Sequence, residues 1–391
     1  MHNNYILGFV YFIFLSLGMS QAHFEFLGSG GNQTKNNILI NPSWGVDSRT
    51  FTVEKFNAEY ASKISSLKIG RIDDDFKIIL EDVYKEENKG SKFKKRGPRY
   101  YERNAGWLNY DEEYQIFITV TGANYKFNSI YVNKSPEEFD LDSGDIEVML
   151  DPAPDFLAGE PAFFSTSNDR FYFVSLSLDD EIFFTNTVDE GLDKIYPVGL
   201  KSLDLVSLPI RSIAVSNDNS DLIFVTYSEA LSKIYHIPID INDTSMKFNT
   251  PVEIQKPDNT LNYFSCLRHP NMNSRYILIG SNNELDTKNS AYAFIMNDGI
   301  EEGKFLFYRH REDNASYIAP EIQFDPSSNK IYFLKPTSNN EKILSFWDGE
   351  KINETDMDLK NIRDFKISPD GERLLVVTFE PKDMYIYKIN K

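Results

Sequence analysis

One segment near the end of the chain decides the fold class: Phe365-Lys366-Ile367-Ser368-Pro369-Asp370-Gly371-Glu372-Arg373-Leu374-Leu375-Val376-Val377. An apolar strand enters a Ser-Pro-Asp-Gly turn, and an aliphatic strand leaves it. Proline fixes φ at the first turn position, aspartate caps the turn with its side chain, and glycine accepts the left-handed conformation. A further strand follows at Met384 to Tyr387. The segment therefore predicts consecutive antiparallel strands.

The same plan recurs along the chain with looser turns. The turn centres lie 45 to 57 residues apart, at Asp111, Asn168, Asn217, Asn271, Asp325 and Asp370. A period near 50 residues is typical of β-propeller blades, and the 3.6-residue apolar periodicity of a helical solenoid is absent. We predict an all-β protein that forms a single β-propeller. An aromatic content of 14% agrees with this class.

The first repeat is less regular than the others. It is expected over residues 43–84, with strands at Thr50–Val53, Leu67–Ile69 and Phe76–Leu80. Counting it gives seven four-stranded blades, and six is the alternative if this unit is only an embellishment.

The last repeat lacks a fourth strand. The segment His23–Leu27 alternates in polarity and can supply that strand beside Tyr385-Ile386-Tyr387, which would remove an exposed sheet edge. The propeller would then occupy residues 23–391. Gly28-Ser29-Gly30-Gly31 is interpreted as a flexible linker behind the closing strand.

The Ser-Pro-Asp-Gly turn before an aliphatic strand, with the later Tyr385-Ile386-Tyr387 strand, resembles the WD-repeat-like blades of TolB-type propellers. It is also similar to the propeller domain of prolyl-oligopeptidase-type serine peptidases. The likeness covers about residues 100 to 391. Those peptidases carry their nucleophile in a hydrolase domain, and this sequence contains no G-x-S-x-G motif, so the resemblance does not imply peptidase activity.

Residues 1–22 are interpreted as a signal peptide. Tyr5 to Leu17 is apolar and Ser20-Gln21-Ala22 offers a small-x-small cleavage site. The run is shorter than the ~20 residues of a membrane span. We therefore expect a secreted, extracellular glycoprotein without a membrane span, and a monomer. The expected glycosylation sites are Asn32, Asn242, Asn314 and Asn353.

Charge and cysteine content exclude several classes. A net charge of −18 argues against nucleic acid and anionic membranes as partners. Cys266 is the only cysteine, so no intramolecular disulfide and no cysteine-based metal site can form. The stability of the protein must therefore come from a large core.

One basic segment stands out in this acidic chain, and we interpret residues 85–104 as a loop insertion. It is expected to be exposed, and it could also dock an acidic partner or a glycan. The residues of this possible partner patch are Lys92, Lys94, Lys95, Arg96, Arg99, Tyr100 and Tyr101.

Catalytic and metal-binding residues cannot be assigned from the sequence. The five histidines, His2, His23, His236, His269 and His310, show no metal-ligand spacing. Acidic runs such as Asp73-Asp74-Asp75 are expected at solvated turn tips, and none has the alternating ligands of an EF-hand loop. The cofactor is therefore unknown. A Ca²⁺ ion in the central channel is possible, but no ligand pattern in the sequence supports it.

Three readings of the function remain after these exclusions. The favoured one is a secreted, non-catalytic binding protein that uses the channel or the loop faces of the propeller for a protein, glycan or small-molecule ligand. The alternative is a secreted enzyme, lactonase-like or cyclotransferase-like, with a metal in the central channel. A third reading is an orphan peptidase-type propeller that pairs with another chain.

Overall fold

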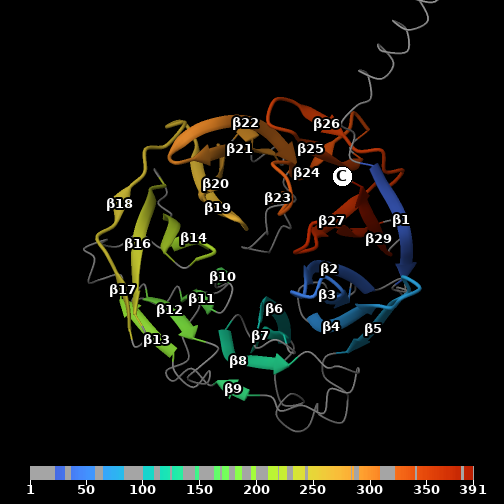
Figure 1. Cartoon of the computed structure of the whole chain (residues 1–391), viewed down its shortest axis with the longest axis horizontal. Helices are drawn as coiled ribbons and strands as arrows, with labels where there is room; N and C mark the ends of the chain where they lie inside the picture. Colours follow the sequence, from blue (N-terminus) through green and yellow to red (C-terminus); the bar gives the residue numbers. More distant parts are fainter. Residues whose placement is uncertain are drawn as a thin grey trace, which may run out of the picture.

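The computed structural model describes residues 23–30, 37–57, 65–82, 100–109, 115–123, 126–134, 146–148, 163–167, 170–175, 181–186, 195–199, 210–218, 220–226, 232–242, 245–282, 284–285, 290–308, 322–339, 341–379 and 383–390. These residues form seven antiparallel sheets arranged in a ring around a common centre (Figure 1). The prediction of an all-β propeller with seven blades is therefore confirmed, and the alternative of six blades is wrong.

Each blade follows the same order from its innermost to its outermost strand. Blade 1 contains β2 (Asn37–Trp44), β3 (Thr50–Asn57), β4 (Ser65–Ile72) and β5 (Ile78–Asp82). Blade 2 contains β6 (Tyr100–Asn109), β7 (Gln115–Ala123), β8 (Lys126–Lys134) and β9 (Ile146–Val148). Blade 3 contains β10 (Phe163–Ser167), β11 (Arg170–Ser175), β12 (Glu181–Asn186) and β13 (Ile195–Gly199).

The second half of the ring repeats this plan. Blade 4 contains β14 (Ile210–Val215), β15 (Asp221–Thr226), β16 (Ile234–Asn242) and β17 (Ser245–Phe248), and β18 (Val252–Glu253) also pairs with β16. Blade 5 contains β19 (Asn262–His269), β20 (Met272–Ser281), β21 (Ser290–Asn297) and β22 (Ile300–Tyr308). Blade 6 contains β23 (Ile322–Phe324), β24 (Ile331–Pro336), β25 (Lys342–Trp347) and β26 (Ile352–Glu354). Blade 7 contains β27 (Ile362–Ile367), β28 (Arg373–Thr378), β29 (Met384–Asn390) and β1 (His23–Gly30).

Blade 1 has an innermost strand that the sequence analysis did not identify. Pro42 interrupts the apolar pattern of β2, and proline cannot donate to a sheet ladder. The structure accommodates it with a register shift between Ile40 and Ser43, where β2 pairs with β3. The irregular first repeat is therefore a complete blade.

The core lies between neighbouring blades. In blades 5, 6 and 7 both faces of the sheet pack against adjacent sheets, so the strands are apolar on both faces rather than alternating. One buried cluster joins Leu39 and Val53 of blade 1 to Leu375 and Ile386 of blade 7. Other clusters join blades 4 and 5, blades 5 and 6, and blades 6 and 7. Burial between sheets thus holds this part of the ring together.

The N-terminal strand β1 completes blade 7. It pairs antiparallel with β29, from His23 opposite Asn390 to Gly30 opposite Met384. The Phe24 ring meets the ring of Tyr332 edge-on at a centroid distance of 6.0 Å. A strand from the beginning of the chain therefore closes the ring next to the last strand, as Figure 1 shows for β1 and β29.

The interpretation of Gly28 to Gly31 as a flexible linker is wrong for Gly28 to Gly30. These residues belong to β1, and they lie against β5 of blade 1. A Cβ atom on Gly28 would stand 2.3 Å from the carbonyl oxygen of Phe76, and one on Gly30 would stand 2.8 Å from the Ile78 Cβ. The glycines are required here because two backbones approach closely.

The expected loop insertion 85–104 needs a correction at its end. Tyr100 is the first residue of β6, where it pairs with Ala123 of β7, so residues 100–104 form part of the innermost strand of blade 2. The sequence pattern placed this strand only at Trp107-Leu108. Pairing with β7 extends it back to Tyr100. Lys92, Lys94, Lys95, Arg96 and Arg99 lie outside the described residues.

Candidate functional site

The turns between the first and second strands of the blades form the candidate site. All seven sheets share one strand order, so these turns lie at the same end of the ring. We call the turns of blades 1, 4, 5, 6 and 7 the turn ring, with the described residues 45–50, 216–218 and 220–221, 269–272, 325–330 and 368–373. The corresponding turns of blades 2 and 3 contain residues outside the described part of the chain.

Most of these turns are fixed by a side-chain oxygen that accepts a backbone hydrogen bond. In blade 7 the Ser368 Oγ accepts from the Arg373 N–H at 2.9 Å, and in blade 4 the Ser216 Oγ accepts from the Asp221 N–H at 3.0 Å. In blades 1 and 6 the acceptor is an aspartate: Asp47 accepts from the Thr50 N–H at 2.8 Å, and Asp325 accepts from the Ser327 N–H at 2.9 Å. Serine and aspartate at these positions therefore set the turn geometry.

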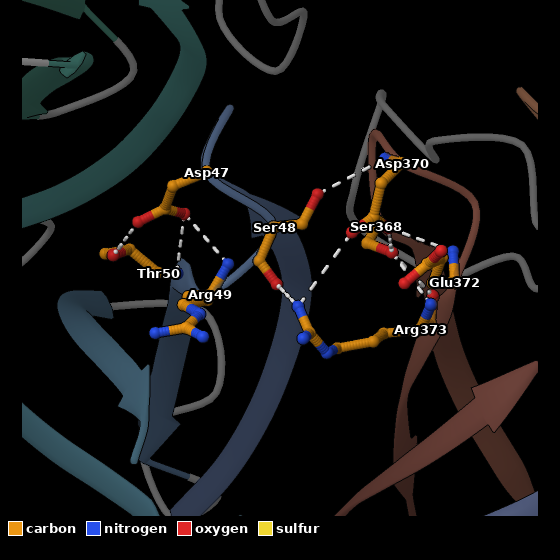
Figure 2. Close-up of polar contacts among 8 residues, drawn as sticks. All are labelled: Asp47, Ser48, Arg49, Thr50, Ser368, Asp370, Glu372 and Arg373. Atoms are coloured by element: carbon orange, nitrogen blue, oxygen red, sulfur yellow. Dashed lines mark hydrogen bonds and ion pairs between the residues drawn. The ribbon is translucent and has the colours of Figure 1, made fainter. Parts of the chain in front are cut away.

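Neighbouring turns are also bonded to each other, and Figure 2 shows this where blade 7 meets blade 1. The Asp370 N–H donates to the Ser48 Oγ at 3.2 Å, and the Arg373 guanidinium donates to the Ser48 carbonyl oxygen at 2.7 Å. Ser48 is buried and has a φ of 56°, an uncommon conformation for a residue other than glycine. The backbone conformation in which the Ser48 carbonyl oxygen accepts from Arg373 of blade 7 is therefore an unfavourable one for serine.

Between blades 4 and 5 the link is a buried ion pair. The Arg268 guanidinium donates to the Asp221 carboxylate and to the Asn273 carbonyl oxygen. Burial lowers the pKa of Arg268 to about 10, so the arginine remains charged at neutral pH. His236 Nε2 lies 3.2 Å from the second carboxylate oxygen of Asp221. Burial lowers the pKa of His236, which favours its neutral form.

Blade 5 is linked to blade 6 by a second buried arginine. The Arg275 guanidinium donates to the Asn329 Oδ1 at 3.0 Å, and its Nε lies 3.1 Å from a Glu302 carboxylate oxygen. The Asn271 side chain donates to the Pro326 carbonyl oxygen at 2.7 Å. These contacts join one turn directly to the next.

His269, at the start of the blade 5 turn, is buried and not exposed to solvent. Its ring lies 4.9 Å from the ring of Phe324, and its Nδ1 accepts a hydrogen bond from the Asn271 N–H at 3.1 Å. Burial, with the nearby charge of Arg275, lowers the pKa of His269. The structure therefore gives His269 a packing role between blades 5 and 6.

Blade 6 is linked to blade 7 by a side-chain amide and by close packing. The Gln323 amide accepts from the Ile367 N–H at 2.9 Å and donates to the Ile367 carbonyl oxygen at 3.3 Å. A Cβ on Gly371 would stand 2.6 Å from the Ser327 Oγ, and Gly371 has a φ of +70°. The Ser-Pro-Asp-Gly turn therefore requires glycine at position 371, because the backbone is left-handed there and a Cβ atom would clash with Ser327.

The outer surface of the turn ring carries exposed charged residues, most of them acidic: Asp47, Arg49, Asp218, Asp370 and Glu372. Asp74 of the adjacent β4–β5 turn lies 3.8 Å from Arg49. Burial opposes ionisation of Asp218, but hydrogen bonds from Ser220 and Ser216 hold its pKa below the ordinary value. The turns thus expose charged side chains, while hydrogen bonds and ion pairs between neighbouring blades fix the backbone of the turns.

The glycosylation sites expected from the sequence fall in different places. Asn242 is the last residue of β16, beside the turn into β17. Asn353 lies in β26, where its side-chain amide donates to the Asp348 carboxylate at 2.6 Å. Asn32 and Asn314 lie outside the described residues.

No metal centre is found in the described part of the chain, where no group of three or more His, Cys, Asp or Glu residues is arranged to hold an ion. Asp73, from the acidic run considered for calcium, accepts hydrogen bonds from the backbone of its own turn, at 2.7 Å from Lys77. Among the same residues, no helix has the length and hydropathy needed to cross a membrane.

Sequence reasoning missed the basic residues beneath the turns. Arg268 lies one residue before the blade 5 turn and Arg275 three residues after it, whereas Arg373 is the last residue of the blade 7 turn. Each of the three bonds to a neighbouring blade. An arginine within a few residues of each polar turn is the signal that could have indicated them, because such a side chain can reach an adjacent turn.

No family model matches the chain, and the search of curated proteins gave no significant match. Among solved structures the chain is similar to one described as the Dos1 propeller, with 9% identity, a TM-score of 0.48 and coverage of 94% of this chain and 96% of that one. It is also similar to a chain of the mitotic checkpoint complex, with 9% identity, a TM-score of 0.47 and coverage of 95% of each chain. The class of this protein, an all-β propeller, rests on its own seven sheets.

We expect Cys266 to be unreactive in the folded protein. It is buried, its N–H donates to the Ser212 Oγ at 3.1 Å, and burial raises the pKa of its thiol to about 12. The thiolate that reacts with alkylating reagents is therefore scarce and inaccessible. Mass spectrometry after iodoacetamide treatment should show no adduct under native conditions and one adduct in guanidinium chloride. Rapid native labelling would contradict the placement of this residue between blades 4 and 5.

Proposed function

We propose that this chain is a secreted, TolB-like binding protein without catalytic residues of its own, and that it binds its partner on the turn ring. The observation that carries the proposal is that adjacent turns are bonded to each other, as at Ser48, Asp370 and Arg373. Loops on a rigid scaffold bind at a low entropic cost, because little conformational freedom is lost on association. The opposite surfaces of the same turns remain exposed and charged.

A charge-reversal experiment tests this proposal. Glu372 lies in the turn ring, and Asp74 and Asp75 lie in the adjacent β4–β5 turn of blade 1. All three are exposed, and the contacts described for them stay within their own blades. The control reverses Asp240 and Glu301, which are exposed on β16 and β22. The protein and both variants are produced in secreting cells, cross-linked in the medium and analysed by quantitative mass spectrometry.

We expect the turn variant Asp74→Lys/Asp75→Lys/Glu372→Lys to yield at least ten-fold less of the partner that cross-links to the unaltered protein, and the control variant Asp240→Lys/Glu301→Lys to retain it. Equal yields from both variants would contradict binding on the turn ring. A stoichiometric, tightly held metal ion in the purified protein, measured by plasma mass spectrometry, would contradict the non-catalytic proposal and favour a channel enzyme instead.

A further inference from the structure

The closing strand begins where a processed chain would begin. β1 starts at His23, directly after the expected cleavage site Ser20-Gln21-Ala22. Cleavage after Ala22 converts the His23 backbone nitrogen from an amide into an α-ammonium group. That group is positively charged below its pKa of about 8 and has three hydrogen-bond donors instead of one.

An acidic loop faces this end of the strand. The loop runs from residue 355 to residue 361, between β26 and β27, and Asp356 Oδ1 accepts a hydrogen bond from the Phe24 N–H at 3.2 Å. Asp358 lies close enough to contribute, after burial and Tyr385, to raising the pKa of Tyr387. Tyr387 pairs with Phe26 in β1, so this loop lies along the first half of the closing strand.

The carboxylate of Asp356 is within reach of a charge on the preceding residue. Consecutive backbone nitrogens in an extended chain are about 3.6 Å apart. A carboxylate that accepts from the Phe24 nitrogen is therefore within reach of a charged donor on His23. An ammonium group can rotate a donor toward that carboxylate, whereas an amide linked to Ala22 has a single hydrogen in a fixed plane.

We propose that cleavage after Ala22 places the α-ammonium group of His23 on the Asp356 carboxylate, and that this ion pair fastens the closing strand in the ring. The proposal rests on the proposed secretion, since it needs the leader to be removed. A chain that keeps residues before His23 carries its terminal charge farther from Asp356. Processing then strengthens the closure of the propeller.

The first measurement identifies the N-terminus. Protein secreted by eukaryotic cells is analysed by intact mass and by N-terminal sequencing, and we expect His23 as the first residue. A first residue elsewhere overturns the proposal. Retention of the protein inside the cells overturns the proposed secretion, and the proposal with it.

The second measurement tests the ion pair itself. Chains that begin at His23, Ala22 or Gln21 are released from a fusion partner by a protease and compared by differential scanning calorimetry at low salt. We expect the Tm of the Ala22 and Gln21 chains to be about 0.3–1.3 °C lower than that of the His23 chain, as for one exposed ion pair in a domain of this size. Identical Tm values for the three chains would overturn the proposal.

A matched substitution assigns the effect to Asp356. Asp356→Asn keeps an acceptor for the Phe24 N–H and removes the charge, so it should abolish the Tm difference between the His23 and Ala22 chains. Asp240→Asn, on an exposed position of β16 in blade 4, should leave that difference unchanged. A difference that persists in Asp356→Asn shows that the extension acts in another way, and it overturns the ion pair even if secretion and cleavage are as proposed.

Discussion

Deleting residues 23–30 is expected to destabilise the propeller strongly and to leave it prone to aggregation. The deletion exposes the edge of β29 and removes the seven residue pairs that join it to β1. It also removes the Phe24 ring from its edge-on contacts with Tyr332 and Tyr387. Lost backbone pairing and lost burial together cost at least about 5 kcal/mol, which is comparable to the total stability of many domains.

Circular dichroism melting and size-exclusion chromatography measure this outcome. We expect the truncated chain to aggregate through its open sheet edge or to melt at least about 6 °C below the intact chain. Addition of a synthetic peptide with the sequence of residues 23–30 should restore part of the lost Tm. A truncated chain with an unchanged Tm would contradict closure of the ring by β1.

Two point variants in β1 distinguish the stability lost with a core contact from the stability lost by any substitution in this strand. Phe24 is partly buried and packs against the core that joins blades 6 and 7, whereas Phe26 is 55% exposed. Phe24→Ala should therefore lower the stability by about 2 kcal/mol or more, and Phe26→Ala by less than about 1 kcal/mol. Equal effects would contradict the face of β1 that the structure directs into the core.

The second large effect is expected from Asp221→Ala, at the link between blades 4 and 5. The Arg268 side chain is only 7% exposed, and Asp221 is the carboxylate that pairs with it. Removing that carboxylate leaves a buried guanidinium without its counter-charge, which typically costs about 3–5 kcal/mol. Urea denaturation of the two proteins measures this difference as a shift in the transition midpoint.

A double-mutant cycle identifies the uncompensated charge as the cause. Arg268→Met removes the charge and keeps much of the buried length of the side chain, so Asp221→Ala/Arg268→Met should be more stable than Asp221→Ala alone. Asp240→Ala, at an exposed position of β16 in the same blade, is the control and should cost less than about 1 kcal/mol. Additive losses in the double variant would show that the pair contributes little beyond the turn itself.

The blade pattern could be predicted because its signals are local. The Pro369-Asp370-Gly371 turn and the aliphatic strand after it lie within a dozen residues, and turn chemistry of this kind depends on neighbouring residues. Ser368 and Asp47 then fix their turns in the structure through their own side chains. β2 was missed because Pro42 breaks the apolar pattern, and only pairing with β3 makes the segment a strand.

The candidate site could not be predicted in the same way. Asp221 and Arg268 belong to different blades, as do Ser48 and Arg373, and nothing local in the sequence indicates that these residues meet. Their contacts depend on the distance and rotation between neighbouring sheets. Gly28 was interpreted as a linker residue for the same reason, because its tight contact with Phe76 comes from another blade.

The sequence by itself determined an all-β propeller, the turns that separate its strands and the candidate strand for its closure, because side-chain chemistry and polarity alternation act over a few residues. Only the tertiary structure decided that there are seven blades, which glycines allow backbones to touch, and that polar turns are bonded to one another across the blade boundaries. These features arise when sheets distant in sequence pack into a closed ring. The packing then places an arginine of one blade on an acceptor of the next.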